Sequence, residues 1–423
     1  MVTAKPASIN RGRWIVWSAT ALTMLVLPLI FSKGGEITLL SQMGTMIIFA
    51  LSYNMLLGQS GMLSFGHAVY SGLGAYFAIH AMNFMAKGQL PVSITLLPLV
   101  GGLAGMLFGV IFGYVSTKRA GTTFAMISLG IGELVFACSL MFPGFFGGEG
   151  GISGNRAIGP PFLGIDYKSP IQVYYLIAAW CFVCMVAMYA FTQTPLGRLA
   201  NAVRDNPERV EFIGYDTQKV RWMILIVSGF FAGISGGLSA IMFEIVTAEN
   251  VSGIRSGGVL LAAFIGGALF FFGPILGACL FIFFVVALSE FTKAWLLYLG
   301  LFFVMMVMYA PGGIAGLILM QFPVLRAGRF REMLKPYALA GLAGLVLVAG
   351  LILLIEFTYH YSLEMADGSK LKLFGVQADV ATAGPWIIVM VLLAAGGLAC
   401  WKAWASVRAK WGQIQSDLAG AGR

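Results

Sequence analysis

Apolar runs long enough to cross a lipid bilayer recur through almost the whole of this 423-residue chain. A spanning helix needs about 20 apolar residues, because the hydrocarbon core is ~30 Å thick and a helix rises ~1.5 Å per residue. Only helices and closed barrels satisfy their own backbone in lipid, and these runs are far too long for barrel strands. The pattern predicts an all-α polytopic membrane protein, with spans near 14–32, 38–57, 62–82, 92–115, 121–143, 171–191, 223–246, 258–272, 275–291, 296–311, 337–355 and 385–403.

The composition supports this fold class. Hydrophobic residues make up 59% of the chain and charged residues only 10%, against ~25% charged residues in a typical soluble domain. A soluble enzyme, a disordered chain and a secreted disulfide scaffold are all excluded, because none of them could hold so much apolar surface. The five cysteines lie inside apolar runs without metal-ligand spacing, so we expect packed thiols.

The basic residues predict an orientation. Twelve spans place both termini on one side, and 18 of the 26 Lys and Arg residues fall on that side. The positive-inside rule makes it the cytoplasmic side. The net charge of +9 is therefore a topology signal directed at cytosol and anionic headgroups, and no nucleic-acid partner is expected. Gly273-Pro274 leaves open whether 258–291 is two spans or one broken segment.

Two glycine stripes predict close helix packing. Missing side chains four residues apart let a neighbouring helix approach backbone to backbone. A tightly packed bundle is the interpretation we favour, and the stripes indicate no substrate. The glycines are Gly101, Gly105, Gly109 and Gly113 in one span, and Gly229, Gly233 and Gly237 in another.

The sequence contains neither a nucleotide-binding motif nor a zinc-protease motif. G-x-x-x-x-G-K-[ST] and H-E-x-x-H are both missing from it. Glu133 is the one acid near the middle of a span, and either lines a path or hydrogen-bonds a neighbour. One central acid is fewer titratable groups than ion coupling usually needs within the spans. An ion-coupled secondary transporter of small organic solutes nevertheless stays open as an alternative. A structural or assembly role is a third possibility.

The charged loop 192–222 predicts a bent pair of short helices. Thr194-Pro195 and Asn206-Pro207 are helix starts, and Gly214 is a natural stop. Leu196, Leu199, Ala200 and Val203 line one face of the first helix, and Val210, Phe212 and Ile213 form the apolar part of the second. Such a pair either docks into a groove of a partner protein or lies on the membrane surface.

The stretch from Gly58 to His67 interrupts two apolar runs with glycines and hydroxyl side chains. It predicts a broken helix at membrane depth, where free backbone N–H groups can face an anionic substrate group. A cytoplasmic turn with a helix cap explains the same residues.

Six stretches, in order over residues ~40–320, resemble the permease subunits of branched-chain amino acid ABC importers of the LivM type. They are Gly58-Gln-Ser-Gly-Met-Leu-Ser-Phe-Gly-His67, Thr122-Thr-Phe-Ala-Met-Ile-Ser-Leu-Gly130 followed by Glu133, Gly147-Gly-Glu-Gly-Gly151, Pro195-Leu-Gly-Arg198 through Gly214, the set Gly266, Gly267, Gly273, Pro274 and Gly277, and Pro311-Gly-Gly-Ile-Ala-Gly316.

The resemblance implies a multi-pass permease subunit in a bacterial inner membrane. The expected partners are a second homologous permease in a heterodimer, two cytosolic ABC ATPases, a periplasmic solute-binding protein and the bilayer. ATP would bind to the ATPases, so this chain is expected to be no enzyme and to hold no cofactor, catalytic residue or metal. The solute would be a branched-chain amino acid or a related small polar molecule, because the family also serves urea, amides and aromatic acids.

The resemblance also assigns residues and domains. Residues 1–325 would form the permease core, and 326–423 a C-terminal extension with two further spans and a cytoplasmic tail. The translocation-path candidates are Ser60, Ser64, His67 and Glu133. The candidates for contact with the ATPase are Arg198, Arg204, Glu208, Glu211 and Gly214.

Overall fold

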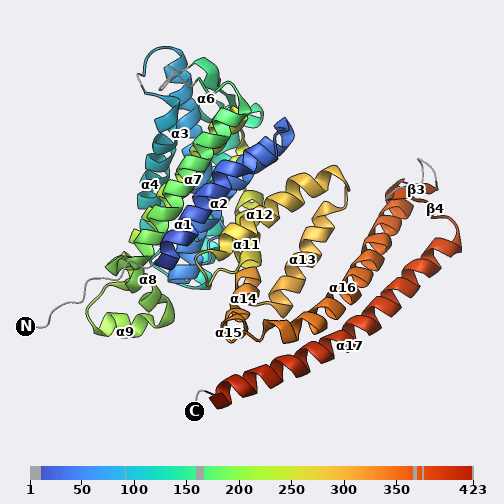
Figure 1. Cartoon of the computed structure of the whole chain (residues 1–423). Helices are drawn as coiled ribbons and strands as arrows, with labels where there is room; N and C mark the ends of the chain where they lie inside the picture. Colours follow the sequence, from blue (N-terminus) through green and yellow to red (C-terminus); the bar gives the residue numbers. More distant parts are fainter. Residues whose placement is uncertain (1–10, 91, 159–165, 365–368, 374–375, 422–423) are drawn as a thin grey trace, which may run out of the picture. The chain divides into compact units, whose positions relative to one another are not determined.

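A computed structural model describes residues 11–90, 92–158, 166–364, 369–373 and 376–421 (Figure 1). The chain forms two compact units, which are described separately below. The first comprises the chain up to Phe291 together with Leu299–Gly316, and the second comprises Thr292–Tyr298 together with Leu317 onward.

The first unit is a helical bundle with one two-stranded ribbon. Its elements are α1 (Arg11–Ile30), α2 (Gly34–Ser60), α3 (Ala68–Ala86), η1 (Ile94–Leu96), α4 (Leu97–Ser116), α5 (Thr122–Met141), α6 (Pro143–Phe146), η2 (Gly148–Gly150), β1 (Ile152–Ser153), η3 (Arg156–Ile158), α7 (Pro170–Gln193), α8 (Pro195–Asp205), α9 (Pro207–Phe212), α10 (Thr217–Phe243), β2 (Ile245–Val246), η4 (Ala248–Val251), α11 (Gly253–Gly266), α12 (Gly273–Ile282), η5 (Phe283–Ala287) and η6 (Leu288–Glu290). Most of α13 (Trp295–Tyr309) and the first half of α14 (Gly313–Met320) also belong to it.

The helices confirm an all-α polytopic membrane protein. Every predicted span overlaps a helix. Within the described ranges, eight helices are long and apolar enough to cross a membrane, or nine if the bent pair of α13 with Gly313–Arg326 counts as one span. This is fewer than the twelve predicted, because α11 and the apolar part of α1, Trp14–Ile30, each have fewer than 18 residues, and α3 is diluted by polar residues such as His80 and Asn83.

The two glycine stripes pack against each other. Gly105 lies on the backbone of Gly229, and Gly233 lies on the backbone of Gly101, so that a methyl group at either position would overlap a carbonyl oxygen. The Trp222 indole N–H donates to the Val110 carbonyl at 3.0 Å across the same contact. Helices α4 and α10 are thus in backbone contact, as the glycine spacing predicted.

Serine hydroxyls join α10 to α2 on its other side. Ser228 donates to the Ser52 carbonyl at 2.6 Å, and Ser235 donates to the Thr45 carbonyl at 2.8 Å. These four residues are buried. Because both bonds end on carbonyls of a continuous helix, they add polar contacts without breaking the α2 backbone.

Residues 258–291 form a tight hairpin. Gly277 packs on the Ala262 backbone, and Gly273 packs on the backbone of Gly266 and Gly267, so α11 and α12 run antiparallel from a shared turn. With 14 residues, α11 is about 21 Å long and shorter than the ~30 Å core. The segment is therefore one short helix followed by one of spanning length, Gly273–Glu290.

The second unit is built around a long helical hairpin. It contains α15 (Phe322–Arg326), α16 (Phe330–Tyr359), η7 (His360–Glu364), the antiparallel strands β3 (Lys370–Leu373) and β4 (Val376–Asp379), and α17 (Ala383–Ala421). Arg329 bonds Glu332 and Asp417 at 2.7 Å each, which ties the start of α16 to the end of α17. The assignment of residues 1–325 to a permease core and of 326–423 to a C-terminal extension stays a prediction.

The glycine contact between α4 and α10 is testable. We expect Gly233→Leu to destabilise the protein by about 1–3 kcal/mol or more, because the added atoms would overlap backbone that cannot move aside. Gly130→Ala is the control, since no atom lies within 4 Å of its added methyl. Thermal unfolding in detergent measures both. Equal midpoints for the two variants would contradict close α4–α10 packing.

Candidate docking surface and translocation path

Helices α8 and α9 are started by the caps that the sequence predicts. The Thr194 hydroxyl accepts the Gly197 backbone N–H at 3.2 Å, and the Asn206 side chain accepts the Arg209 N–H at 3.0 Å. A proline follows each cap, where its missing N–H costs nothing. The pair lies at one end of the bundle, and α6 lies at the other (Figure 1).

One side of this pair is buried. Val203, Val210 and Val220 form a small apolar cluster, with Leu196 and Leu199 packed against it. The cluster joins α8 and α9 to the first turns of α10. The pair is therefore packed on α10 through apolar side chains.

The opposite side of the pair exposes apolar side chains. Phe212 is 89% exposed and Ile213 is 66% exposed, with Tyr215 beside them. Val210, Phe212 and Ile213 form the predicted apolar part of this helix, and of the three only Val210 faces the cluster. The tip of α9 is thus a compact apolar patch (Phe212, Ile213 and Tyr215) at the end of a bundle.

The five predicted coupling residues divide into two groups. Arg198, Glu208 and Gly214 are exposed, with φ of +92° at Gly214. Arg204 instead pairs with Asp205 at 2.9 Å and donates to the Gly58 carbonyl at the end of α2. Glu211 is exposed as well, but its carboxylate accepts the Thr217 hydroxyl at 2.7 Å. Arg204 and Glu211 therefore hold the loop on the bundle.

Asp216 caps the first turn of α10. Its carboxylate accepts the backbone N–H groups of Gln218 at 3.0 Å and Lys219 at 3.1 Å. The bond from the Lys219 N–H, followed by that from the Lys219 side chain, lowers the pKa of Asp216 below its ordinary value. The cap is thus charged at neutral pH, and its contribution to folding is lost only as the pH falls into the acid range.

The predicted break between α2 and α3 is present. Gly61, with φ of +69°, ends α2, and residues 61–67 are not helical. The Phe65 N–H donates to the Ser128 hydroxyl of α5 at 3.0 Å, and the Ala68 N–H donates to the Ser256 hydroxyl of α11 at 3.0 Å. Side chains from two other helices thus replace hydrogen bonds that the broken helix lacks.

His67 places this segment at membrane depth. Its Nε2 lies 3.0 Å from the Ser52 hydroxyl, which is about 12 Å of helix before Ser60. The ring is fully buried among Phe49, Tyr53 and Tyr70. The segment therefore turns back along α2 into the bundle, and this favours a broken helix over a surface turn.

Three of the four path candidates are enclosed by the chain itself. Ser60 and Ser64 are buried like His67, and the Ser60 hydroxyl donates to the Leu56 carbonyl of its own helix at 2.8 Å. Their assignment to a path stays a prediction. Of the three, His67 is joined across the break to the Ser52 hydroxyl of α2.

Glu133 differs from them, because it is exposed. It lies near the middle of α5 on a face shared with Met126 and Leu129, which are 70% and 40% exposed. A charged group at the centre of a spanning helix costs about 2.5–3.5 kcal/mol when it faces lipid. This face of α5 is therefore suited to contact with another protein or with water.

Arg255 falls between the predicted spans 223–246 and 258–272. In the structure it occupies the first turn of α11, partly buried, with its guanidinium carbon 5.8 Å from the centre of the Phe49 ring near the midpoint of α2. The cap signal was available, because Ser252 precedes Gly253-Ile254-Arg255 as an N-cap residue precedes a helix. An arginine therefore stands inside the bundle.

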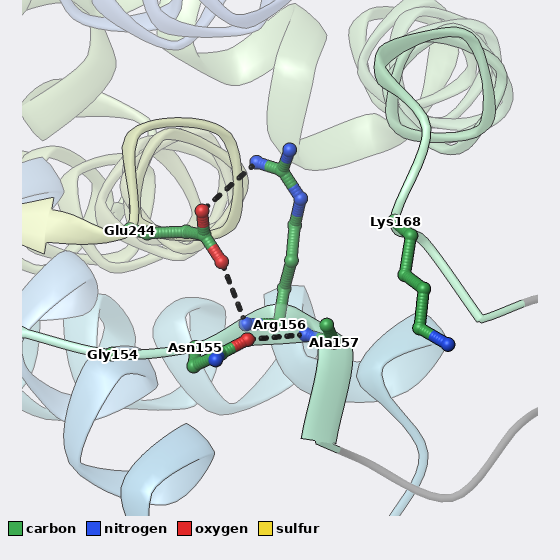
Figure 2. Close-up of a pocket in the computed structure, with 6 residues that line it drawn as sticks. All are labelled: Gly154, Asn155, Arg156, Ala157, Lys168 and Glu244. Carbon is green, nitrogen blue, oxygen red and sulfur yellow. Dashed lines mark hydrogen bonds and ion pairs between the residues drawn. The ribbon is translucent and has the colours of Figure 1, made fainter.

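A pocket of about 270 Å³ lies at the other end of the bundle from α8, where the loop after β1 meets the end of α10 (Figure 2). Arg156 closes it by donating to the carbonyls of Tyr167, Ile241 and Met242, and its side chain lies 3.7 Å from the Glu244 carboxylate. Lys168 points away from this pair (Figure 2). The Arg156 side chain is thus engaged by groups of the protein itself, and its bonds fasten the loop after β1 to the end of α10.

Within the described part of the chain, no group of three or more His, Cys, Asp or Glu side chains is placed to hold a metal ion.

Residues 37–310 match the family described as the permease component of the branched-chain amino acid transport system, and the chain belongs to this family. A transport permease is not an enzyme class. The chain is thus a multi-pass permease subunit of an ABC importer, a kind of protein that works with other subunits.

Named relatives agree with this family. The chain is 25% identical to the high-affinity branched-chain amino acid transport system permease protein LivM of Salmonella typhimurium over 308 residues, which cover 68% of this chain and 71% of the relative. It is 25% identical to the LivM protein of Escherichia coli, covering 63% and 67%. It is also 25% identical to the guanosine ABC transporter permease protein NupQ of Bacillus subtilis, covering 55% and 74%. No solved structure matches this chain.

The serine bonds to the broken segment give a test. We expect Ser256→Ala to lower the free energy of unfolding by about 1–3 kcal/mol, because it leaves the buried Ala68 N–H without a partner. Ser41→Ala is the matched control: Ser41 is 2% exposed and Ser256 is 1% exposed, but the Ser41 hydroxyl bonds only the Ile37 carbonyl of its own helix. Denaturation in detergent compares them, and a larger loss for Ser41→Ala would refute the proposed role.

Proposed function

We propose that this chain is the membrane-spanning subunit of an ATP-driven importer in a bacterial inner membrane, and that it passes a branched-chain amino acid or a related small polar solute. The family match carries the proposal, together with the exposed apolar tip of α9. The LivM relatives favour an amino acid, while the guanosine permease shows that related chains serve other solutes.

The energy would come from two separate cytosolic ABC ATPases. The sequence holds no Walker A motif, so ATP would bind to those partners and no cofactor would bind here. Phe212 and Ile213 would enter a groove of an ATPase, flanked by the charges of Arg198 and Glu208. A short helix with an exposed apolar tip suits this mode of docking. The loops richer in Lys and Arg lie at this end of the chain's predicted topology, which supports a cytoplasmic location.

The contacts of α8 suggest how movement would reach the path. The apolar cluster of Val203, Val210 and Val220 joins α8 and α9 to α10. Arg204 bonds the Gly58 carbonyl, which lies directly before the broken segment 61–67. A shift of the ATPases would thus be passed both to α10 and to the backbone beside His67.

The path itself would lie between this chain and a second homologous permease. The exposed face of α5 that holds Glu133 would meet that subunit, which removes the carboxylate from lipid. Glu133 would attract the ammonium group of a passing amino acid. A periplasmic solute-binding protein would deliver the solute at the end of the bundle opposite α8.

Loss of the apolar tip should release the ATPase. We expect Phe212→Ser to lower co-purification of the ATPase at least about tenfold, since exposed aromatic residues at an interface carry much of its binding energy. Ile254→Ser is the matched control, because Ile254 is also 89% exposed but lies on α11. Retention of the ATPase by the Phe212 variant, at the level of the control, would contradict docking through α9.

The energy source can be measured directly. In proteoliposomes that hold the full complex, we expect uptake of L-leucine, L-isoleucine or L-valine to require enclosed ATP and to be unchanged by a proton uncoupler over short times. An ion-coupled carrier has the opposite behaviour. Prompt collapse of uptake on uncoupling, with ATP present, would reject the importer and favour the secondary transporter.

A further inference from the structure

The Arg255 guanidinium has few partners in the chain. Its Nη2 donates to the Ser239 hydroxyl at 3.4 Å, and its guanidinium carbon lies 5.8 Å from the centre of the Phe49 ring. Among the residues that the structure describes, no carboxylate lies within 4.0 Å of it. Arginine carries five N–H donors, so most of them remain available to a ligand.

Arg156 provides an internal comparison. Its side chain donates three hydrogen bonds to carbonyls and lies beside the Glu244 carboxylate. Arg255 is partly buried like Arg156, lies beside the midpoint of α2 and has a single hydroxyl partner. An arginine left with so few partners beside the middle of a spanning helix is the reverse of what stability alone would select.

The surroundings of Arg255 favour an anion. It lies in the first turn of α11, where backbone N–H groups and the helix dipole attract negative charge. The carboxylate of Glu133 borders the same turn, because its Oε1 lies 3.2 Å from the position of a methyl group at Gly253. Ile254, between these two positions, is 89% exposed. One helical turn thus carries a cationic side chain and adjoins an anionic one.

We propose that Arg255 binds the carboxylate of the transported solute during its passage, while Glu133 meets the ammonium group of the same class of molecule. The ligand is a small zwitterion or organic acid, and a guanidinium binds a carboxylate through two parallel N–H bonds. The inference rests on the proposed function, because it places this contact on the path of an importer.

The experiment uses the complete complex in proteoliposomes with enclosed ATP and a saturating amount of binding protein loaded with L-leucine. Arg255→Gln is expected to slow uptake at least about tenfold, and Arg255→Lys about threefold, because lysine keeps the charge without the paired bonds. ATP hydrolysis stimulated by the loaded binding protein should stay within about twofold of the original protein in both, since docking and ATPase contacts are unchanged. Ser41→Ala is the control and is expected to retain uptake, because the Ser41 hydroxyl bonds only the Ile37 carbonyl of its own helix.

The outcomes separate the two proposals. If the unmodified complex fails to accumulate any amino acid with ATP, or transports only a solute without a carboxylate such as guanosine, the amino-acid assignment fails and the Arg255 contact fails with it. If leucine uptake is normal and Arg255→Gln stays within about twofold of it, only the Arg255 contact is overturned. If Arg255→Gln does not assemble, Arg255→Lys decides: slowed uptake with normal hydrolysis supports the contact, and unchanged uptake rejects it.

Discussion

The whole arrangement depends on one requirement, that each polar group at membrane depth be covered by protein or water. The break between α2 and α3 meets it through hydroxyls on neighbouring helices, with Ser128 on Phe65 and Ser256 on Ala68. The α4–α10 contact meets it by placing backbone against backbone at Gly101 and Gly233 and at Gly105 and Gly229. Serine hydroxyls and close glycine contacts placed in this way can hold an irregular segment inside a bundle. Transporters bind solutes at such segments.

Two charged side chains in the described part of the chain are not fully covered by groups of the chain itself. Glu133 is exposed on α5, and Arg255 has one hydroxyl partner. Neither is expected to face lipid, because the energetic cost would be large. Both are explained if the subunit is incomplete alone, with a second permease over α5 and a solute beside α11. The apolar tip of α9, at the far end of the bundle, is incomplete in the same sense and calls for a soluble partner.

Much of this could be predicted from the sequence where the signal is local. The caps of α8 and α9 follow from Thr194-Pro and Asn206-Pro, and the broken helix follows from its glycines and serines. Tertiary relations were hidden. The spacing of the glycines in the two stripes does not show that the stripes face each other. The positions of Val210 and Phe212 in the sequence do not show which of the two is buried. Arg255 falls outside the predicted spans, because α11 begins at Gly253, five residues before the apolar run 258–272.

The central claim is that the α5 face bearing Glu133 meets a second permease. A photoreactive benzophenone amino acid in place of Met126, which is 70% exposed on that face, tests it in the assembled complex in its native membrane. The account predicts an adduct with the homologous permease as the main product. Adducts with lipid alone would show that this face is open to the bilayer, and the path between two permeases would have to be abandoned.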